Sequence, residues 1–235
     1  MTNQFPYRIF PLGDAALTID FGNIIDEGIN ITVLELFDQL KANPLPGQLE
    51  AVPAYSSLTI YYNTTELFKM IPPGTGVFEW MSQQARQFLD KPTPPSTREQ
   101  RTMTVPVCYD EYFAPDISQV AAKNNISVEE VIRLHTGKQF RVYMLGFLPG
   151  FSYMGELDEK MSMPRKEQPR MVSAGSVGIA GRQTGIYPQA SPGGWQIIGR
   201  TPMKLFDPQQ HEPVVLHAGD IVQFIPISKD EFANY

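Results

Sequence analysis

The sequence predicts an α+β protein with two domains, a small N-terminal α/β domain and a second domain of β-barrel or β-sandwich type. Three observations predict this. Strand-like and helix-like periods alternate up to residue 89. Three prolines lie within residues 92–95, and from Gly146 onward glycines and prolines separate short strand-like pieces. We place the domains at 1–92 and 102–235, with a proline-rich linker at 93–101.

The N-terminal domain begins with two predicted strands, at residues 7–13 and 15–22, joined by a tight turn. Asp26 is placed to cap a helix whose apolar residues recur at helical spacing until the sequence NPLPG ends it. A third strand is expected at 56–63, and a second helix at 78–89. We expect the first helix to pack on the sheet that these strands form.

The second domain begins with a predicted strand at residues 102–109, followed by two short helices. Asp116 is placed to cap the first helix, and Ser127 with Glu130 gives a capping-box signature for the second. Another strand is expected at 139–147. The later segments VSAGSVGIA, GWQIIG and DIVQFIPI are short and strand-like, without a long helical pattern, which favours a compact barrel or sandwich.

Composition disfavours several classes of function. The formal net charge is -6, and the 19 lysines and arginines form no basic stripe, which disfavours nucleic-acid binding. No apolar stretch is long enough to cross a membrane, and the first residues do not resemble a signal peptide. With one cysteine, no internal disulfide can form. We therefore expect a cytoplasmic protein without a membrane partner.

Several common catalytic motifs are absent from the sequence. There is no HExxH or CxxC pattern, so we expect no metal site. Neither GxxxxGK[ST] nor GxGxxG occurs, so any nucleotide is expected to bind mainly to another chain. There is also no GxSxG elbow. The single thiol, Cys108, lies in a strand-like segment, where a small buried side chain is its expected role.

His135 has two interpretations. It ends a predicted helix just before Gly137, where a cationic imidazole would interact favourably with the carbonyl end of the helix dipole. Alternatively, it serves a functional site, since histidine titrates near neutral pH. The sequence favours the first interpretation but leaves the second open.

The segment GFLPGFSYMGELDEKMSMPRKEQPR combines stiff backbone with aromatic and cationic side chains. Such a loop suits binding through Phe147, Phe151, Tyr153 and Arg165. The alternative is that the aromatic residues simply fill the core, because large aromatic side chains dominate cores as well as interfaces. Both interpretations can hold for different residues of the segment.

A second segment, SAGSVGIAGRQTGIYPQASPGGWQIIGRTP, contains seven glycines and three prolines. This density indicates tight turns and close backbone approach. Exposed amides in such turns can hold a carboxylate, a phosphate or a partner's carbonyl, and polar and aromatic side chains would add specificity. The alternative is a barrel whose corners need glycine. The candidates here are Gln183, Tyr187, Pro188, Gly193, Gly194, Trp195 and Arg200.

Four sequence blocks together identify a family. They are PLGDAAL, FRVYMLGFLPGFSYMG, the arginines that precede AGSVGIAG, and QTGIYPQASPGGWQIIGRTP. With these blocks the chain resembles the family of the 5-oxoprolinase B subunit, which also contains KipI and the allophanate hydrolase subunit 1 halves of urea carboxylases. Ser152 and Glu156 depart from the family pattern at positions where proline and glycine are usual. The resemblance spans almost the whole length and implies that the second domain is a cyclophilin-like β-barrel.

The resemblance implies one component of an ATP-dependent 5-oxoprolinase, which opens 5-oxoproline to L-glutamate. The implied partners are the C subunit, of the KipA or allophanate hydrolase subunit 2 type, and the LamB/YcsF-like A subunit. ATP is expected as the cosubstrate of the complex. Two alternatives stay open: a KipI-type inhibitor that binds a histidine kinase, and a carboxyltransferase or allophanate hydrolase subunit of a urea-degrading system.

The candidate site residues fall into two groups. The catalytic candidates are His135, Gln183, Tyr187 and Arg200. The candidates for binding substrate or a partner are Phe147, Phe151, Tyr153, Arg165, Pro188, Gly193, Gly194 and Trp195.

Overall fold

The chain divides into two compact units, Met1–Glu99 and Gln100–Tyr235, in a computed structural model that describes residues 5–91 and 100–235. The α+β class is confirmed, and the second unit is a closed barrel rather than a sandwich. Most of the predicted linker, at residues 92–99, lies outside the described residues.

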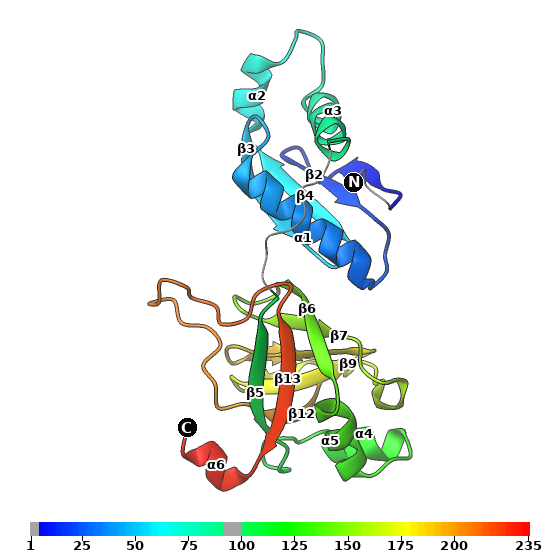
Figure 1. Cartoon of the computed structure of the whole chain (residues 1–235), viewed down its shortest axis with the longest axis vertical. Helices are drawn as coiled ribbons and strands as arrows, with labels where there is room; N and C mark the ends of the chain where they lie inside the picture. The colour runs from blue at the N-terminus through cyan, green and yellow to red at the C-terminus, as the bar shows by residue number, and fades with distance from the viewer. Residues whose placement is uncertain (1–4, 92–99) are drawn as a thin grey trace. The chain divides into compact units, whose positions relative to one another are not determined.

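The first unit contains a four-stranded antiparallel sheet in the order β1-β2-β4-β3 (Figure 1). Helix α1 covers one face of this sheet. Strand β3 and helix α2 had not been predicted from the sequence. The elements are β1 (Arg8–Pro11), β2 (Ala16–Asp20), α1 (Glu27–Ala42), β3 (Gln48–Pro53), β4 (Ser57–Tyr62), α2 (Thr64–Met70) and α3 (Val77–Leu89).

Local sequence explains the ends of the helices in this unit. The Asp26 side chain accepts a hydrogen bond from the backbone N–H of Ile29, so it caps α1 as predicted. The Asn63 side chain caps α2 in the same way, through the N–H of Glu66. The apolar faces of the helices and the sheet then form one core, which includes Leu17, Ile19, Val33, Leu40, Leu58, Ile60 and Met81.

The second unit is a seven-stranded closed barrel in the order β10-β7-β6-β13-β5-β12-β9 (Figure 1). Strands β13 and β5 pair in parallel, and the other neighbouring pairs are antiparallel. Two further strands, β8 and β11, form a separate ribbon. The strands are β5 (Thr102–Cys108), β6 (Gln139–Leu145), β7 (Ser152–Gly155), β8 (Arg170–Val172), β9 (Ser176–Ala180), β10 (Gln183–Ile186), β11 (Ser191–Gly193), β12 (Gln196–Arg200) and β13 (Ile221–Ile227).

Short helices accompany the barrel. The Ser127 side chain caps α5 through the N–H of Glu130, whose own carboxylate bonds instead to Arg133. The terminal helix α6, which had not been predicted, has a complete capping box between Ser228 and Glu231. The helices of this unit are α4 (Ile117–Lys123), α5 (Val128–Thr136), the 3-10 turn η1 (Glu159–Met161) and α6 (Lys229–Ala233).

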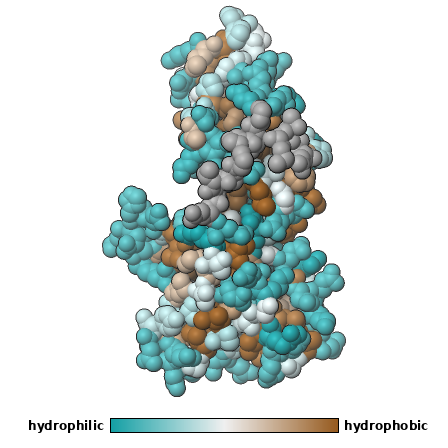
Figure 2. All heavy atoms as spheres, in the orientation of Figure 1, coloured by the Kyte–Doolittle hydropathy of each residue, from teal (hydrophilic) through white to brown (hydrophobic). Residues whose placement is uncertain are grey.

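The barrel interior is filled by apolar side chains, and hydrophilic residues cover much of the face of this unit seen in Figure 2. A small molecule would have to displace these side chains to enter the barrel. Its central residues include Val105, Val107, Phe140, Val142, Ile179, Ile198 and Phe224.

Candidate functional site

An aromatic pocket of about 290 Å³ lies on the outside of the second unit. Its walls come from the loop before β7, from β7 itself, from the chain between β10 and β12, and from residues 165–169. We call it the aromatic pocket. Its lining residues are Phe147, Phe151, Tyr153, Arg165, Lys166, Glu167, Pro169, Tyr187, Pro192, Gly193, Gly194 and Trp195.

Phe151 is the centre of the ring packing in this pocket. Its ring centroid lies 5.0 Å from that of Tyr187, 5.5 Å from that of Trp195 and 4.7 Å from that of Tyr153. These pairs are edge-on, the arrangement that aromatic rings favour over a face-to-face sandwich. Phe151, Tyr187 and Trp195 are all buried in one hydrophobic cluster, so their rings support one another.

Glycines make room for these rings. A Cβ atom on Gly185 would lie 2.7 Å from the carbonyl oxygen of Ser152 and 3.0 Å from Cζ of Phe151. A Cβ atom on Gly178 would lie 3.0 Å from Cβ of Trp195. The glycines of β9 and β10 therefore serve both the barrel and the pocket, because they let the side chains of Phe151 and Trp195 pack closely against these strands.

Phe147 lies at the mouth of the pocket with its side chain 62% exposed. Its φ is 68°, in the left-handed region that residues with a Cβ rarely occupy. The turn around it is closed by hydrogen bonds from Leu148 N–H to Gly146 O and from Phe151 N–H to Leu148 O. An exposed phenylalanine on a strained backbone is typical of a functional loop. Phe151 is buried, as the core interpretation of this segment expects, whereas Phe147 is exposed, so a binding role for Phe147 stays a prediction.

The polar groups in the wall of this pocket include the phenols of Tyr153 and Tyr187 and the guanidinium of Arg165, together with Lys166 and Glu167. Burial raises the pKa of Tyr153 and of Tyr187, and the positive charge of Arg165 acts in the opposite direction on both. The backbone of Trp195 also opposes the rise in the pKa of Tyr187. Both tyrosines are therefore neutral hydrogen-bonding groups near pH 7. Among the described residues, Arg165 makes no ion pair with a carboxylate of the chain.

Lys166, the next residue along the chain, is held by a buried ion pair. Its Nζ lies 2.5 Å from Oδ2 of Asp116, which also accepts a hydrogen bond from Ile197 N–H at 2.6 Å. Asp116 is the N-cap residue of α4, as predicted, but its side chain makes no capping hydrogen bond, because these two donors engage it. The pair instead fixes the segment that carries Arg165 to strand β12.

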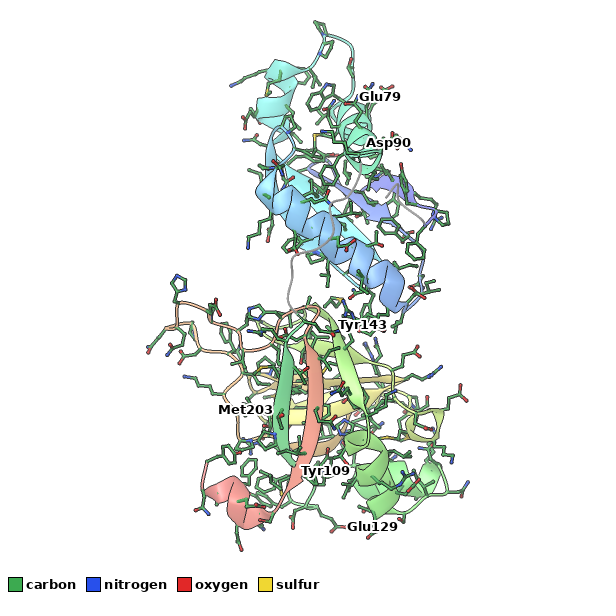
Figure 3. All side chains as sticks on the ribbon, in the orientation of Figure 1. Glu79, Asp90, Tyr109, Glu129, Tyr143 and Met203 are labelled. Atoms are coloured by element: carbon green, nitrogen blue, oxygen red, sulfur yellow. The ribbon has the colours of Figure 1, made fainter. Side chains whose placement is uncertain are left out.

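His135 lies inside the barrel and away from the pocket. Its Nδ1 is 2.7 Å from the Tyr109 hydroxyl, and its Nε2 is 3.0 Å from Oγ1 of Thr184. Tyr109 lies just beyond the end of β5 (Figure 3). Burial lowers the pKa of His135 to about 3, so the expected cationic imidazole at the helix end is wrong. The geometry gives His135 a structural role.

Tyr187 is the only catalytic candidate that lines the aromatic pocket. Gln183 begins β10, where it pairs with Gly155 and Ala180. Arg200 ends β12 and donates through Nε to the carbonyl of Ala174 at 2.7 Å, beside a different surface pocket. The pocket also gathers the seven binding candidates Phe147, Phe151, Tyr153, Arg165, Gly193, Gly194 and Trp195, whereas Pro188 is buried and does not line it.

Four lining residues had not been predicted from the sequence: Lys166, Glu167, Pro169 and Pro192. Pro192 lies within the YPQASPGGW block, and the other three follow Arg165 closely, so their position beside predicted residues was the available signal. Cys108 is buried in β5, as expected.

The described residues contain neither a metal-binding cluster nor a membrane-spanning helix. Within residues 5–91 and 100–235, no three or more His, Cys, Asp or Glu side chains are grouped as a metal site requires. In the same ranges, no helix has the length and apolar character needed to span a membrane.

Residues 7–216 match the family model described as carboxyltransferase domain, subdomain C and D. Over 231 residues, the chain is 43% identical to the B subunit of 5-oxoprolinase from Bacillus subtilis (strain 168), covering 97% of this chain and 96% of that protein. It is 34% identical to the B subunit of 5-oxoprolinase from Escherichia coli O157:H7, covering 93% of this chain and 95% of that protein. The crystal structure of TTHA0988 aligns with a TM-score of 0.76 at 34% identity over 91% of this chain. This chain spans only 40% of TTHA0988.

Proposed function

The chain belongs to the family of the carboxyltransferase domain, subdomain C and D, and we propose that it is the B subunit of an ATP-dependent 5-oxoprolinase. The family match confirms the resemblance that the sequence motifs indicated. The observation that carries the proposal is similarity to two proteins named as this subunit of 5-oxoprolinase, over at least 93% of this chain and 95% of theirs.

The aromatic pocket supports a role in holding the substrate. The lactam ring of 5-oxoproline is small and carries one carboxylate. Arg165 offers that carboxylate a guanidinium that has no ion pair within the described residues. The rings of Phe151 and Trp195 would contact the apolar edge of the lactam, and the neutral phenols of Tyr153 and Tyr187 would bond to its carbonyl or N–H.

The proposed reaction needs more than this chain. Transfer of the γ-phosphoryl group of ATP to the lactam oxygen would release ADP and activate the ring carbon. Water would then attack that carbon, the ring C–N bond would break, and phosphate would leave, with a second water supplying the final carboxylate oxygen. Since the sequence has neither GxxxxGK[ST] nor GxGxxG, we propose that a partner holds ATP.

We propose the KipA-type C subunit and the LamB/YcsF-like A subunit as these partners, in a cytoplasmic complex. The length of TTHA0988 supports association with further polypeptide, because this chain spans only 40% of it. In such an assembly, this chain would supply the substrate pocket, and a partner would supply the phosphate-binding loop.

The matched family description favours a second candidate, a protein that transfers a carboxyl group. Identity of 39% over 66 residues to a urea amidolyase from Lachancea kluyveri supports a urea-degrading system for this candidate. The same pocket would then hold a carboxyl donor or acceptor, and other chains would supply biotin. The two candidates predict different products, since only the first releases glutamate from 5-oxoproline.

The assembled complex tests the proposed role of the pocket through Arg165→Met. Loss of a charge-assisted hydrogen bond should raise the KM for 5-oxoproline by about tenfold or more, while the subunits still co-purify. Arg133→Met is the matched control, because Arg133 lies on the exposed face of α5 and bonds to Glu130. A KM that is unchanged by Arg165→Met would show that this pocket does not bind the substrate. Kinase inhibition by a complex without turnover would instead favour the KipI-type alternative.

A further inference from the structure

A second, polar pocket of about 450 Å³ adjoins the aromatic pocket. The two share Arg165, Lys166 and Glu167, so this short segment forms the wall between them. The far side of the polar pocket is formed by helix α4 and by Gln196 at the start of β12. Apart from Arg165, the residues of this second pocket have no part in the proposed binding of the lactam ring.

Cations dominate the polar pocket. Lys123, Arg165 and Arg170 all line it, and none of the three has an ion-pair partner within residues 5–91 and 100–235. Lys166 also lines it, but Asp116 neutralises that ammonium. Glu167 supplies the remaining carboxylate. The pocket therefore carries an excess of positive charge together with one available carboxylate, an arrangement that suits an anion bearing an ammonium group.

A buried acceptor in the pocket wall gives independent support. Gln196 is only 4% exposed, and its Nε2 donates to the carbonyl of Pro164 at 3.0 Å. Its Oε1 is buried and has no hydrogen-bond partner in the part of the chain that is described. A buried carbonyl without a donor is costly, and a ligand N–H is one means of satisfying it.

We infer that the polar pocket binds an acidic amino acid, with its two carboxylates at the unpaired cations and its ammonium at Gln196 and Glu167. The inference rests on the proposed function for the choice of amino acid, because L-glutamate is the ring-opened product. The adjoining aromatic pocket would hold the closed ring. Once the C–N bond breaks, the product gains an ammonium group and a second carboxylate, both of which suit the polar pocket better.

The test measures binding of L-glutamate and of glutarate to the full chain by isothermal titration calorimetry, without ATP or partners. Glutarate has both carboxylates but no N–H donor. L-glutamate should bind, and glutarate should bind about tenfold or more weakly. Arg170→Met should weaken L-glutamate binding by about tenfold or more. Gln196→Met should reduce the preference for L-glutamate over glutarate, with Glu167 still present to contact the ammonium. Lys204→Met and Gln209→Met, outside the pocket, should leave both affinities unchanged.

Arg170 is exposed at the start of β8, so its variant keeps the test decisive if Gln196→Met fails to fold. Absence of L-glutamate binding to the folded wild-type chain would overturn the inference, as would binding that Arg170→Met leaves unchanged. Glutamate release by the complex would in that case leave the proposed function standing. The converse result is L-glutamate binding that depends on Arg170, together with a complex that shows no turnover. It would support the polar pocket and refute the 5-oxoprolinase role.

Discussion

A Cβ atom on Gly193 would lie 2.5 Å from the hydroxyl oxygen of Tyr187, closer than a carbon and an oxygen can approach without displacement. The Tyr187 ring cannot yield easily, because it is 1% exposed and packs edge-on against Phe151. Glycine at this position therefore fixes where the phenol lies in the aromatic pocket.

Gly193→Ala should displace the Tyr187 ring and lower the kcat/KM of the complex for 5-oxoproline by about tenfold or more, since misplaced site groups lose much of their effect. Gly76→Ala, outside the pocket, is the control. Its Cβ would meet Cβ of Glu79 at 3.9 Å, which is an ordinary contact. Steady-state kinetics and thermal unfolding of both variants check this. Equal kinetics in the two variants would contradict it.

The buried His135 should make stability depend on pH. Its pKa is lowered from 6.5 to about 3 in the folded chain. Between these values the unfolded chain binds a proton that the folded chain does not, so the unfolding free energy falls as pH decreases below about 6.5. The expected slope is up to about 1.4 kcal/mol per pH unit.

Urea unfolding of wild type and His135→Gln from neutral to acidic pH measures this contribution. Glutamine can keep hydrogen bonds to Tyr109 and Thr184 without titrating. The difference in unfolding free energy between the two proteins should shrink as pH falls, whereas His211→Gln should follow wild type. Parallel curves for wild type and His135→Gln would show that the buried imidazole does not titrate as described.

Arg165 should favour the ionised form of the pocket phenols. Burial raises the pKa of Tyr153 and of Tyr187, and Arg165 opposes this rise. Arg165→Met should therefore raise both pKa values further, because the cation no longer favours the phenolate. Tyrosinate absorbance against pH, compared in Tyr153→Phe and Tyr187→Phe backgrounds, separates the two groups. Phenol pKa values that fall or stay constant in Arg165→Met would show that the guanidinium does not act on these phenols.

The Asp116–Lys166 pair should be strongly coupled. Their side chains are 11% and 16% exposed, so Lys166→Met leaves a largely buried carboxylate with only the Ile197 N–H. We expect a loss of about 3 kcal/mol of unfolding free energy. A double-mutant cycle with Asp116→Asn should give a coupling of about 1–3 kcal/mol. The exposed Lys204–Asp207 pair should show much weaker coupling. Additive effects at Asp116 and Lys166 would contradict the ion pair.

Local chemistry made much of the fold predictable. Capping by Asp26 and Ser127 followed from residue type and spacing. Helix α6 was missed although Ser228 and Glu231 carry its capping signal, and α2 was missed because its seven residues give too short a period. Local patterns left a barrel and a sandwich open, because closure depends on β13 pairing in parallel with β5, a pairing between distant segments. The family resemblance predicted the barrel, and the structure confirms it.

Most residues that line the aromatic pocket were predictable, because they lie in two motif-rich segments of the sequence. These segments, around residues 147–153 and 187–195, come together in the fold. His135 was misjudged because nothing local shows that Tyr109 and Thr184 enclose it. The side-chain contacts of Asp116 were not predictable for a similar reason: its long-range donors, Lys166 and Ile197, displace the local capping bond.

Glutamate release from 5-oxoproline, by this chain co-purified with its candidate KipA-type and LamB/YcsF-like partners and with one component omitted at a time, tests the 5-oxoprolinase role. Turnover should require ATP and should stop when this chain alone is left out. Turnover that continues without this chain, or a well-folded complete complex that releases no glutamate, would contradict that role.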